Sequence, residues 1–326
     1  MKNALISGIS GQDGAYLASY LLDKGYQVIG TSRDAQISSF ANLTRLGIKD
    51  RVALVSMALT DFRSVLQVLS VTKPDEIYNL AGQSSVALSF EQPVETLESL
   101  TIGTLNLLEA VRFLARPIRL YNAGSSECFG DIAGKPADES TPFHPRSPYA
   151  VAKAAAHWEV ANYREAYGLF ACTGILFNHE SPLRPERFVT RKIISGACRI
   201  ARGSKEKLKL GNLQIKRDWG WAPEYVDAMW RILQTEKPDD FVIATGETNS
   251  LEDFCALSFK ELGLNWKDHV ETTPDFYRPS EIMVGCGNAD KAEKILKWKA
   301  TSKMHDVIKK MIKAELELID RLKVEG

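Results

Sequence analysis

Two side chains suited to acid–base chemistry stand four residues apart near the middle of the chain. Tyr149 and Lys153 form the pattern YxxxK, and Ser147 and Pro148 precede them as a helix start. Residues four apart share one helix face, so the phenol and the ammonium group meet at one place. A neighbouring cation favours the phenolate form and lowers the pKa of a tyrosine. The spacing predicts that Tyr149 is a general base and that Lys153 is its charge partner.

A second reactive segment, around Ser125 and Glu127, follows the apolar run that predicts a fifth strand. Ligands of α/β sheets bind at the carboxyl ends of the strands. We therefore expect the Ser125 hydroxyl to bond a substrate oxygen beside Tyr149, and the Glu127 carboxylate to face the same cleft. The alternative for Glu127 is a capping or surface carboxylate. Cys128 has no evident base partner and is expected to be a packed side chain.

A glycine pattern lies between the first expected strand and the first expected helix. Gly8, Gly11 and Gly14 are spaced GxxGxxG. Glycine allows a tight turn and a close approach of the backbone to a pyrophosphate, and the helix N-terminus adds amide hydrogens. An ordinary strand-to-helix turn is the alternative, but the strand–helix–strand context favours phosphate binding.

The residues after the second expected strand bear on the choice of dinucleotide. An arginine there accommodates the 2′-phosphate of NADP, whereas an acidic residue binds the free ribose of NAD. Arg33 and Asp34 stand side by side. Arg33 favours NADP, and Asp34 either favours NAD or pairs with Arg33. We expect NADP in preference to NAD.

Cations are concentrated in the second half of a chain whose Lys and Arg (41) equal its Asp and Glu (41) in number. Arginine forks match phosphate oxygens, so this cluster predicts a diphosphate clamp. A solvated surface balanced by carboxylates is the alternative. His179 and Glu180 lack a second histidine at metal-ligand spacing, so we expect no metal site. The cations are Arg184, Arg187, Arg191, Lys192, Lys216 and Arg217.

The elements that position these residues alternate between strand and helix, which indicates a doubly wound parallel sheet of the Rossmann type within the α/β class. We expect a dinucleotide-binding domain with the catalytic residues over 1–178. A smaller, interleaved substrate lobe is expected over 179–326, with some segments returning to the sheet. Apolar runs predict strands at 3–7, 26–31, 52–56, 76–80, 118–122, 170–176 and 241–244. Helical periodicity predicts helices at 15–24, 62–70, 101–114, 147–167, 188–200, 223–233, 251–262 and 303–322.

Composition excludes several classes of function. The 326 residues carry a formal net charge of zero, which argues against nucleic-acid binding. No apolar run reaches the roughly 18 residues of a membrane span. The N-terminal residues lack a signal-peptide layout, and the five cysteines form no CxxC pair. We expect a cytoplasmic protein without membrane contact.

These motifs together resemble those of the extended short-chain dehydrogenase/reductase superfamily, and within it the GDP-mannose 4,6-dehydratase family. The resemblance covers most of residues 4 to 300, and NHESP and KRDWG are far more specific than YxxxK. The matching stretches are GISGQDGAYLA, PDEIYNLAGQSSV, TPFHPRSPYAVAKA, GILFNHESPLRPERFVTRKI, LGNLQIKRDWGWAPEYVDAMW and DFVIATGE.

The resemblance implies an internal-redox reaction in which GDP-mannose loses water to give GDP-4-keto-6-deoxymannose. Tyr149 would take the 4-hydroxyl proton, Ser125 would hold the 4-oxygen, and Lys153 would bind the nicotinamide ribose. Glu127 would remove the C5 proton and protonate the leaving 6-hydroxyl group. The family forms homodimers or homotetramers, which we expect here too.

The same motif matching assigns binding residues. The cofactor residues implied are Gly8, Gly11, Gln12, Asp13, Gly14, Arg33, Ala58, Leu59, Leu80, Ala81, Gly82, Tyr149, Lys153, His179 and Arg184. The GDP-sugar residues implied are Ser84, Asn178, Val189, Lys192, Gly211, Arg217, Arg278 and Glu281.

The chain departs from the family pattern at several positions. Ser125 stands where the family usually has threonine, which keeps the hydroxyl. Ala58 replaces an aspartate near the adenine, and Arg33 is followed by Asp34 rather than by a second arginine. Ser85 replaces a histidine or a bulky residue. These changes bear on cofactor choice and assembly more than on reaction type.

Three alternative functions are consistent with these motifs. A GDP-4-keto-6-deoxymannose reductase shares the serine–glutamate segment, but GQDG, NHESP and KRDWG favour the dehydratase. Another nucleotide-sugar dehydratase or an epimerase of the superfamily is the second, although an epimerase would typically lack the Glu127 carboxylate. A non-catalytic dinucleotide-sensing protein is the third, and it would have no need of Ser125, Glu127, Tyr149 and Lys153 together.

Overall fold

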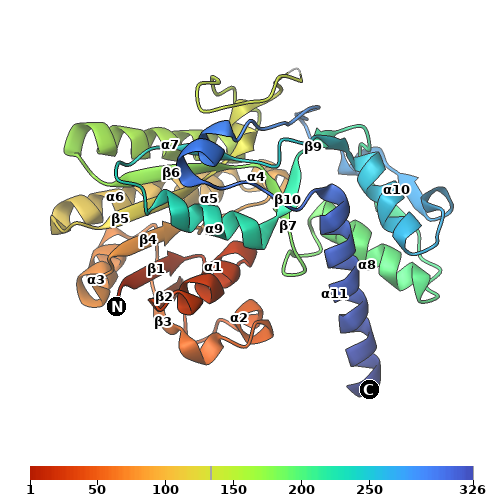
Figure 1. Ribbon diagram of the computed structural model, residues 1–326, viewed down its shortest axis with the longest axis horizontal. Coiled ribbons are helices and arrows are strands. Elements are labelled where there is room, and N and C mark those ends of the chain that lie inside the picture. Colours follow the sequence, from red (N-terminus) through yellow and green to blue (C-terminus); the bar gives the residue numbers. More distant parts are fainter. Residues whose placement is uncertain (133, 326) are drawn as a thin grey trace.

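A parallel sheet forms the centre of the computed structural model, which describes residues 1–132 and 134–325 (Figure 1). In the described part of the chain this sheet has seven strands in the order β11-β6-β5-β4-β1-β2-β3. The order reverses direction between β1 and β4, which is the doubly wound arrangement that the sequence predicts. The strands are β1 (Asn3–Ser7), β2 (Gln27–Ser32), β3 (Ala53–Ser56), β4 (Glu76–Asn79), β5 (Arg119–Ser125), β6 (Ala171–Leu176) and β11 (Phe241–Ile243).

Helices cover both faces of the sheet because successive side chains of each strand point in opposite directions. On β1, Ala4 and Ile6 pack in one core with α1 (Gln12–Asp23) and α9 (Ala222–Ile232). Leu5 packs in the opposite core, with three other helices. These helices are α3 (Phe62–Thr72), α6 (Gly103–Leu114) and α7 (Pro148–Tyr167).

Element boundaries differ from the sequence prediction where backbone pairing continues past the apolar run. Strand β5 extends beyond residue 122 to Ser125, because Ala123, Gly124 and Ser125 pair with the last three residues of β6. Helix α1 begins at Gln12, directly after Gly11, so the glycine turn is tighter than predicted. Three short helices were not predicted, since they are too short for a clear period: α2 (Ala41–Arg45), α4 (Val86–Glu91) and α5 (Pro93–Leu97).

A second hydrophobic core lies in the C-terminal part of the chain, seen at the right of Figure 1. Helix α11 (Met304–Glu325) packs against α8 (Val189–Ala201) and α10 (Leu251–Glu261). Strands β8 (Leu208–Leu210) and β13 (Val270–Thr272) pair beside them. No helix within residues 1–132 and 134–325 is long and apolar enough to cross a membrane.

Short strands connect the two cores. Strand β7 (Asn178–Glu180) pairs with β10 (Trp219–Trp221). Strand β9 (Lys216–Arg217) pairs with β12 (Asn249–Ser250). Strands of two or three residues leave no periodic signal, so the sequence did not predict them. They carry Asn178, His179 and Arg217 between the sheet and the second core.

Candidate active site

The glycine turn after β1 is shaped for a ligand that approaches the backbone closely. Gly8 has φ +79°, and a side chain there would lie 2.8 Å from the backbone of Leu80 and Ala81. A side chain on Gly14 would collide with the carbonyl oxygen of Gly8. The turn therefore requires glycine, and it leads into the N-terminus of α1, whose amide groups favour an anion. These residues fit a dinucleotide diphosphate.

The other residues predicted at the cofactor lie at the same edge of the sheet. Leu80, at the end of β4, donates its amide to Ser7 of β1 over 3.1 Å. Ala81 and Gly82 follow it, and Gly82 has φ +114°. Leu59, in the loop after β3, is fixed by a 2.7 Å bond from Asn106 to its carbonyl oxygen. The strand order brings these loops to one edge although they are far apart in sequence.

An ion pair links the glycine turn to strand β7. His179 Nε2 donates to Asp13 Oδ2 over 2.9 Å, and His179 Nδ1 donates to the carbonyl oxygen of Phe177 over 2.7 Å. Because both partners are acceptors, the ring carries two protons and is an imidazolium. The ring is buried and stacks on Tyr225 with the ring centres 4.5 Å apart.

The electrostatics of this pair follow from its geometry. Burial alone would lower the pKa of His179, but the charge and hydrogen bond of Asp13 outweigh burial and raise it. Burial would raise the pKa of Asp13, but His179 and a bond from Gln12 lower it to about 2. Both shifts favour the charged form of the group concerned.

Two further bonds join the same elements. Gln12 Nε2 donates to the carbonyl oxygen of His179 over 3.2 Å, and Ser181 Oγ donates to Gln12 Oε1 over 2.7 Å. The sequence reasoning did not single out Ser181. Its place in the specific NHESP stretch was the available signal.

The four predicted catalytic residues gather where β5 ends beside α7. Ser147 Oγ accepts the amide of Ala150 over 3.1 Å, so α7 begins where the sequence predicts. One turn into α7, Tyr149 and Lys153 are both buried. Ser125 ends β5, and its Oγ accepts the amide of Glu127 over 3.3 Å. Glu127 lies in the short helical turn η3 (Ser126–Phe129).

Burial dominates the protonation of the catalytic pair. It raises the pKa of Tyr149, which a side-chain hydrogen bond with Ser125 opposes. Burial lowers the pKa of Lys153 to about 8. Lys153 Nζ donates to the carbonyl oxygen of Ala123 over 2.7 Å and lies 5.9 Å from the Tyr149 ring centre. The pKa of Tyr149 is therefore raised in this structure rather than lowered as predicted, because desolvation is the largest effect on it.

Charged residues from the second half face Glu127. Arg278 lies 3.9 Å from Glu127 and 3.6 Å from Glu281. Arg217 is buried and lies 3.3 Å from the same Glu281 oxygen. Burial lowers the pKa of Arg217, while the negative charge of Glu127 opposes this shift. Residues from η3, β9 and the 278–281 segment therefore form one charged cluster beside the predicted catalytic side chains.

The remaining residues predicted at the GDP-sugar lie on four separate segments of the chain. Lys192, one turn into α8 from Val189, donates to the carbonyl oxygen of Lys209 over 2.7 Å. Its ammonium lies 4.4 Å from the centre of the Phe276 ring. A side chain on Gly211 would lie 2.9 Å from the Phe276 carbonyl oxygen. Ser84 is exposed in the loop between β4 and α4, and Asn178 is the first residue of β7.

Two arginines of the predicted clamp already have partners. Arg191 is buried and pairs with Glu315 of α11. Its role is therefore to join α8 to α11, and it is not part of the predicted diphosphate clamp. Arg184 lies 3.3 Å from Glu180 and stacks on Phe188 at 4.0 Å. Its Nε has no hydrogen-bond partner within the described residues.

The loop after β2 gives Arg33 and Asp34 different contacts. Asp34 Oδ1 accepts the amides of Gln36 and Ile37, over 2.8 and 3.3 Å, and so closes its own turn. Arg33 does not pair with it: its side chain is 88% exposed and lies 4.0 Å from Glu95.

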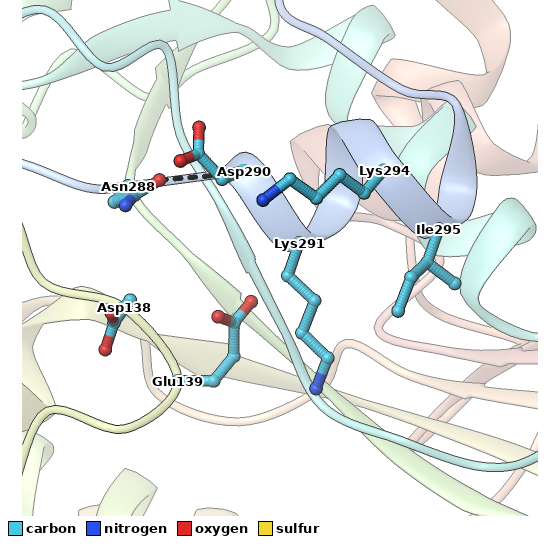
Figure 2. Close-up of a pocket in the computed structure, with 7 residues that line it drawn as sticks. All are labelled: Asp138, Glu139, Asn288, Asp290, Lys291, Lys294 and Ile295. Carbon is cyan, nitrogen blue, oxygen red and sulfur yellow. Dashed lines mark hydrogen bonds between the residues drawn. The ribbon is translucent and has the colours of Figure 1, made fainter.

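A separate hollow of 390 Å³ contains none of the predicted site residues (Figure 2). Glu139 accepts the amide of Val242 there over 2.7 Å, and Lys291 pairs with Asp239 over 2.7 Å. Its charges therefore serve the fold. Within residues 1–132 and 134–325, no group of three His, Cys, Asp or Glu side chains is arranged to hold a metal ion. The hollow is lined by Asp138, Glu139, Asn288, Asp290, Lys291, Lys294 and Ile295.

Comparison with known proteins gives concordant results. A sequence-family model described as GDP-mannose 4,6 dehydratase matches residues 5–311. GDP-mannose 4,6 dehydratase 2 of Arabidopsis thaliana is 51% identical over 333 residues, which cover 99% of this chain and 89% of that protein. The structure of DesIV, a dTDP-glucose 4,6-dehydratase from Streptomyces venezuelae with NAD and TYD bound, is similar with a TM-score of 0.87, 20% identity and 97% coverage of both chains.

A second solved structure shares the fold. RMD from Pseudomonas aeruginosa, complexed with NADPH, has a TM-score of 0.80 and 21% identity, with coverage of 98% of this chain and 100% of that one. At these identities the two structures establish the Rossmann-type fold, and the predicted fold class is confirmed.

His179→Gln is expected to lower the free energy of unfolding by about 2 kcal/mol near pH 6, because it leaves the partly buried Asp13 carboxylate without its cation. The raised pKa of His179 means that its contribution is fully present below the ordinary value of 6.5 and is lost as pH rises through the folded value. The difference between wild type and variant should therefore shrink as pH rises above 6.5 in denaturant titrations.

His157 of α7 provides the matched control, since burial lowers its pKa. The contribution of His157 relative to a His157→Gln variant should become more favourable as pH rises, the opposite trend. A constant effect of His179→Gln from acid to alkaline pH would contradict the imidazolium assignment.

Proposed function

Because this chain belongs to the GDP-mannose 4,6-dehydratase family, we propose that its candidate active site converts GDP-mannose to GDP-4-keto-6-deoxymannose with loss of water. The protein is accordingly a hydro-lyase. One observation carries the assignment to this site: Ser125, Glu127, Tyr149 and Lys153 meet at the carboxyl edge that also holds the glycine turn. An epimerase or a dinucleotide sensor has no need of all four.

The chemistry requires a nicotinamide dinucleotide, and the glycine turn, Leu80–Gly82 and Ala58–Leu59 would hold it. When bound, it supplies a hydride acceptor for C4 of the sugar and returns that hydride to C6. His179 and Arg184 would keep the turn and the adjacent loop in place.

Three side chains take part in the proton transfers. Tyr149 takes the proton of the 4-hydroxyl group while Ser125 bonds the 4-oxygen. The 4-keto group acidifies the C5 proton, which Glu127 removes and delivers to the leaving 6-hydroxyl group, so that water departs. Because burial raises the pKa of Tyr149, its role as base depends on cationic charge from Lys153 and the oxidised dinucleotide.

We propose that the GDP-sugar binds between the two cores, along β7, β9 and α8. Arg217 and Arg278 would bind the diphosphate, because their forked donors match its oxygens. Glu281 orients both, being within 3.6 Å of each guanidinium. Lys192, Val189 and Gly211 line the more distant end with Ser84 and Asn178 nearby. In this proposal residues 1–178 form the dinucleotide half and residues 179–326 contribute mainly to the substrate half.

We propose NADP rather than NAD as the dinucleotide. Asp34 is occupied by its own turn, while Arg33, after the end of β2, is highly exposed and contacts Glu95 only at 4.0 Å. An exposed guanidinium at this position favours a 2′-phosphate.

We also propose that two copies associate through α5 and α7. An exposed apolar face runs over these helices and the adjoining turn η2 (Glu98–Ile102). Trp158 of α7 is 62% exposed there. Apolar faces of this kind mark interfaces, and a twofold axis would let the same face bury itself. Its members are Val94, Leu97, Ile102, Val151 and Trp158.

The activity is tested directly by incubating purified protein with GDP-mannose and either dinucleotide, with the products read by mass spectrometry. A loss of one water without accumulation of reduced dinucleotide is the expected result. Consumption of NADPH with GDP-4-keto-6-deoxymannose would instead identify a reductase. No reaction with either sugar would overturn the substrate assignment.

Glu127→Gln should lower the rate of water loss by at least about a thousandfold, because no base remains for the C5 proton. Oxidation at C4 should persist, because Tyr149 and not Glu127 takes the first proton, so reduced dinucleotide should appear as absorbance at about 340 nm. Tyr149→Phe should give neither product nor reduced dinucleotide. Glu139→Gln, in the separate hollow, should behave as wild type. Full turnover by Glu127→Gln would refute the role of Glu127.

Arg33→Ala should weaken NADP⁺ binding about tenfold and leave NAD⁺ binding unchanged, because only the 2′-phosphate contact is removed. Isothermal titration with each dinucleotide measures both values. Arg51→Ala, which removes another exposed arginine at the opposite, amino end of β3, is the control. Equal weakening of the two dinucleotides would contradict a 2′-phosphate site at Arg33.

Trp158→Glu should convert the assembly to smaller species in light scattering, since it places a charge in the apolar face. Ile295→Glu, at an apolar side chain 54% exposed outside this face, should leave the assembly unchanged. The same mass for wild type and Trp158→Glu would exclude this face as the interface.

A further inference from the structure

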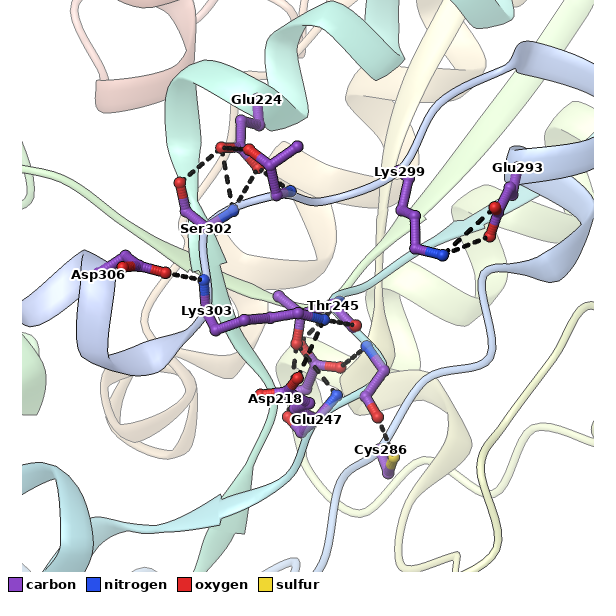
Figure 3. Close-up of polar contacts among 12 residues, drawn as sticks. Asp218, Glu224, Thr245, Glu247, Cys286, Glu293, Lys299, Ser302, Lys303 and Asp306 are labelled. Carbon is purple, nitrogen blue, oxygen red and sulfur yellow. Dashed lines mark hydrogen bonds and ion pairs between the residues drawn. The ribbon is translucent and has the colours of Figure 1, made fainter.

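A buried carboxylate stands directly behind the candidate diphosphate arginine. Asp218 follows Arg217 in sequence and is fully buried. Its Oδ1 accepts the amide of Thr245 over 2.9 Å, and its Oδ2 accepts the amide of Gly246 over 2.8 Å (Figure 3). Both oxygens of one carboxylate thus hold two successive backbone groups just after β11.

The turn that Asp218 holds continues into the strand beside Arg217. Residues 245–248 lead into β12, where Asn249 pairs with Arg217. Gly246 adopts φ +78°, so the chain reverses sharply at the bound amide. Asp218 and the β9–β12 pairing therefore tie the same two segments together at two successive points.

A lysine from the C-terminal segment completes this arrangement. Lys303 Nζ donates to the carbonyl oxygen of Thr245 over 2.6 Å and lies 3.3 Å from Glu247. Burial raises the pKa of Asp218 to about 6, and the amide bonds and the charge of Lys303 oppose this shift. A buried carboxylate of this kind is costly unless such partners are present.

The backbone just before Lys303 is fixed by the Glu224 carboxylate. Glu224, near the start of α9, accepts the amide of Thr301 over 2.8 Å and both polar groups of Ser302. Figure 3 shows this carboxylate bridging to the segment that precedes α11. The position of Lys303 is thus set by contacts outside the candidate active site.

The opposite edge of β9 carries the rest of the charged cluster. The amide of Lys216 donates to Met283 over 2.8 Å, and the amide of Gly285 donates back to Lys216 over 3.0 Å. This pairing brings the 278–281 segment to Arg217, which lies 3.3 Å from Glu281. Strand β9 is therefore clamped between the Asp218 turn and the arginine–glutamate segment.

We propose that Asp218 and Lys303 are positioning residues for the nucleotide-sugar diphosphate: they fix β9 so that Arg217 meets the ligand without having to be ordered on binding. The inference rests on the proposed function, in which Arg217 binds that diphosphate. Neither residue touches the ligand. Preorganisation of this kind contributes to affinity by removing an ordering cost.

The test measures binding of GDP and of NADP⁺ by titration calorimetry in full-length variants. Asp218→Asn keeps one acceptor oxygen but turns an NH₂ group toward the second backbone N–H. It should weaken GDP binding about tenfold and change NADP⁺ affinity by less than about twofold. In turnover assays KM for GDP-mannose should rise while kcat stays within about twofold.

Asp240→Asn is the matched control for the loss of a buried carboxylate. Asp240 accepts the amide of Thr173 over 2.7 Å and pairs with Arg164 over 2.6 Å, at the opposite end of β11. This variant should lower the melting temperature yet leave GDP affinity unchanged. If Asp218→Asn does not fold, Lys303→Met, at a side chain 31% exposed, replaces it and should weaken GDP at least about threefold.

The outcomes separate the inference from the proposed function. Weaker binding of GDP with unchanged binding of NADP⁺ supports the positioning role. Unchanged GDP affinity in Asp218→Asn, or in Lys303→Met where that variant replaces it, overturns that role, as does equal weakening of GDP and NADP⁺. Arg217→Ala is measured in parallel: if it leaves GDP affinity unchanged, the assignment of Arg217 in the proposed function fails as well.

Discussion

The ion pair between Asp13 and His179 is the junction on which the rest of the site depends. It joins the turn built for a dinucleotide diphosphate to β7, the first strand beyond the sheet-forming half of the chain. Strand β7 pairs with β10, which continues from β9 and therefore from Arg217. This ion pair and the two bonds of Gln12 thus hold the glycine turn against the segment that leads to Arg217. The two partners of the ion pair neutralise each other, so the junction carries no uncompensated charge into the core.

The catalytic side chains use burial in a different way. Tyr149 and Lys153 are desolvated by the packing of α7 against the end of β5, and desolvation moves both toward their neutral forms. Such a pair is poised to respond to charge that arrives with the ligands, because a low-dielectric surrounding strengthens each electrostatic contact. In the proposed reaction the scaffold supplies position, and positive charge from Lys153 and the oxidised dinucleotide would favour the phenolate of Tyr149.

Much of this architecture was predictable from the sequence, for reasons that also explain what was not. The seven strands of the sheet are apolar runs with clear ends, and YxxxK and GxxGxxG have fixed spacings on single elements. The family resemblance reached Arg217, Arg278 and Glu281 through motif matching. The contacts of Arg191 with Glu315 and of Asp218 with the 245–246 turn join segments distant in sequence. No local pattern encodes such partners, and strands as short as β7 and β9 leave no period.

The return of α9 and β11 to the sheet has a consequence for how the molecule folds. Phe241 and Ile243 of β11 share one core with α1, and Val226 and Met229 of α9 fill the space beside them. The first half of the chain therefore does not contain its own complete core. Contacts of such long sequence separation slow folding and form late. The core of the N-terminal half is completed only when residues 222–243 pack against it. We therefore expect the two halves to fold together, both during synthesis and on refolding, rather than one after the other.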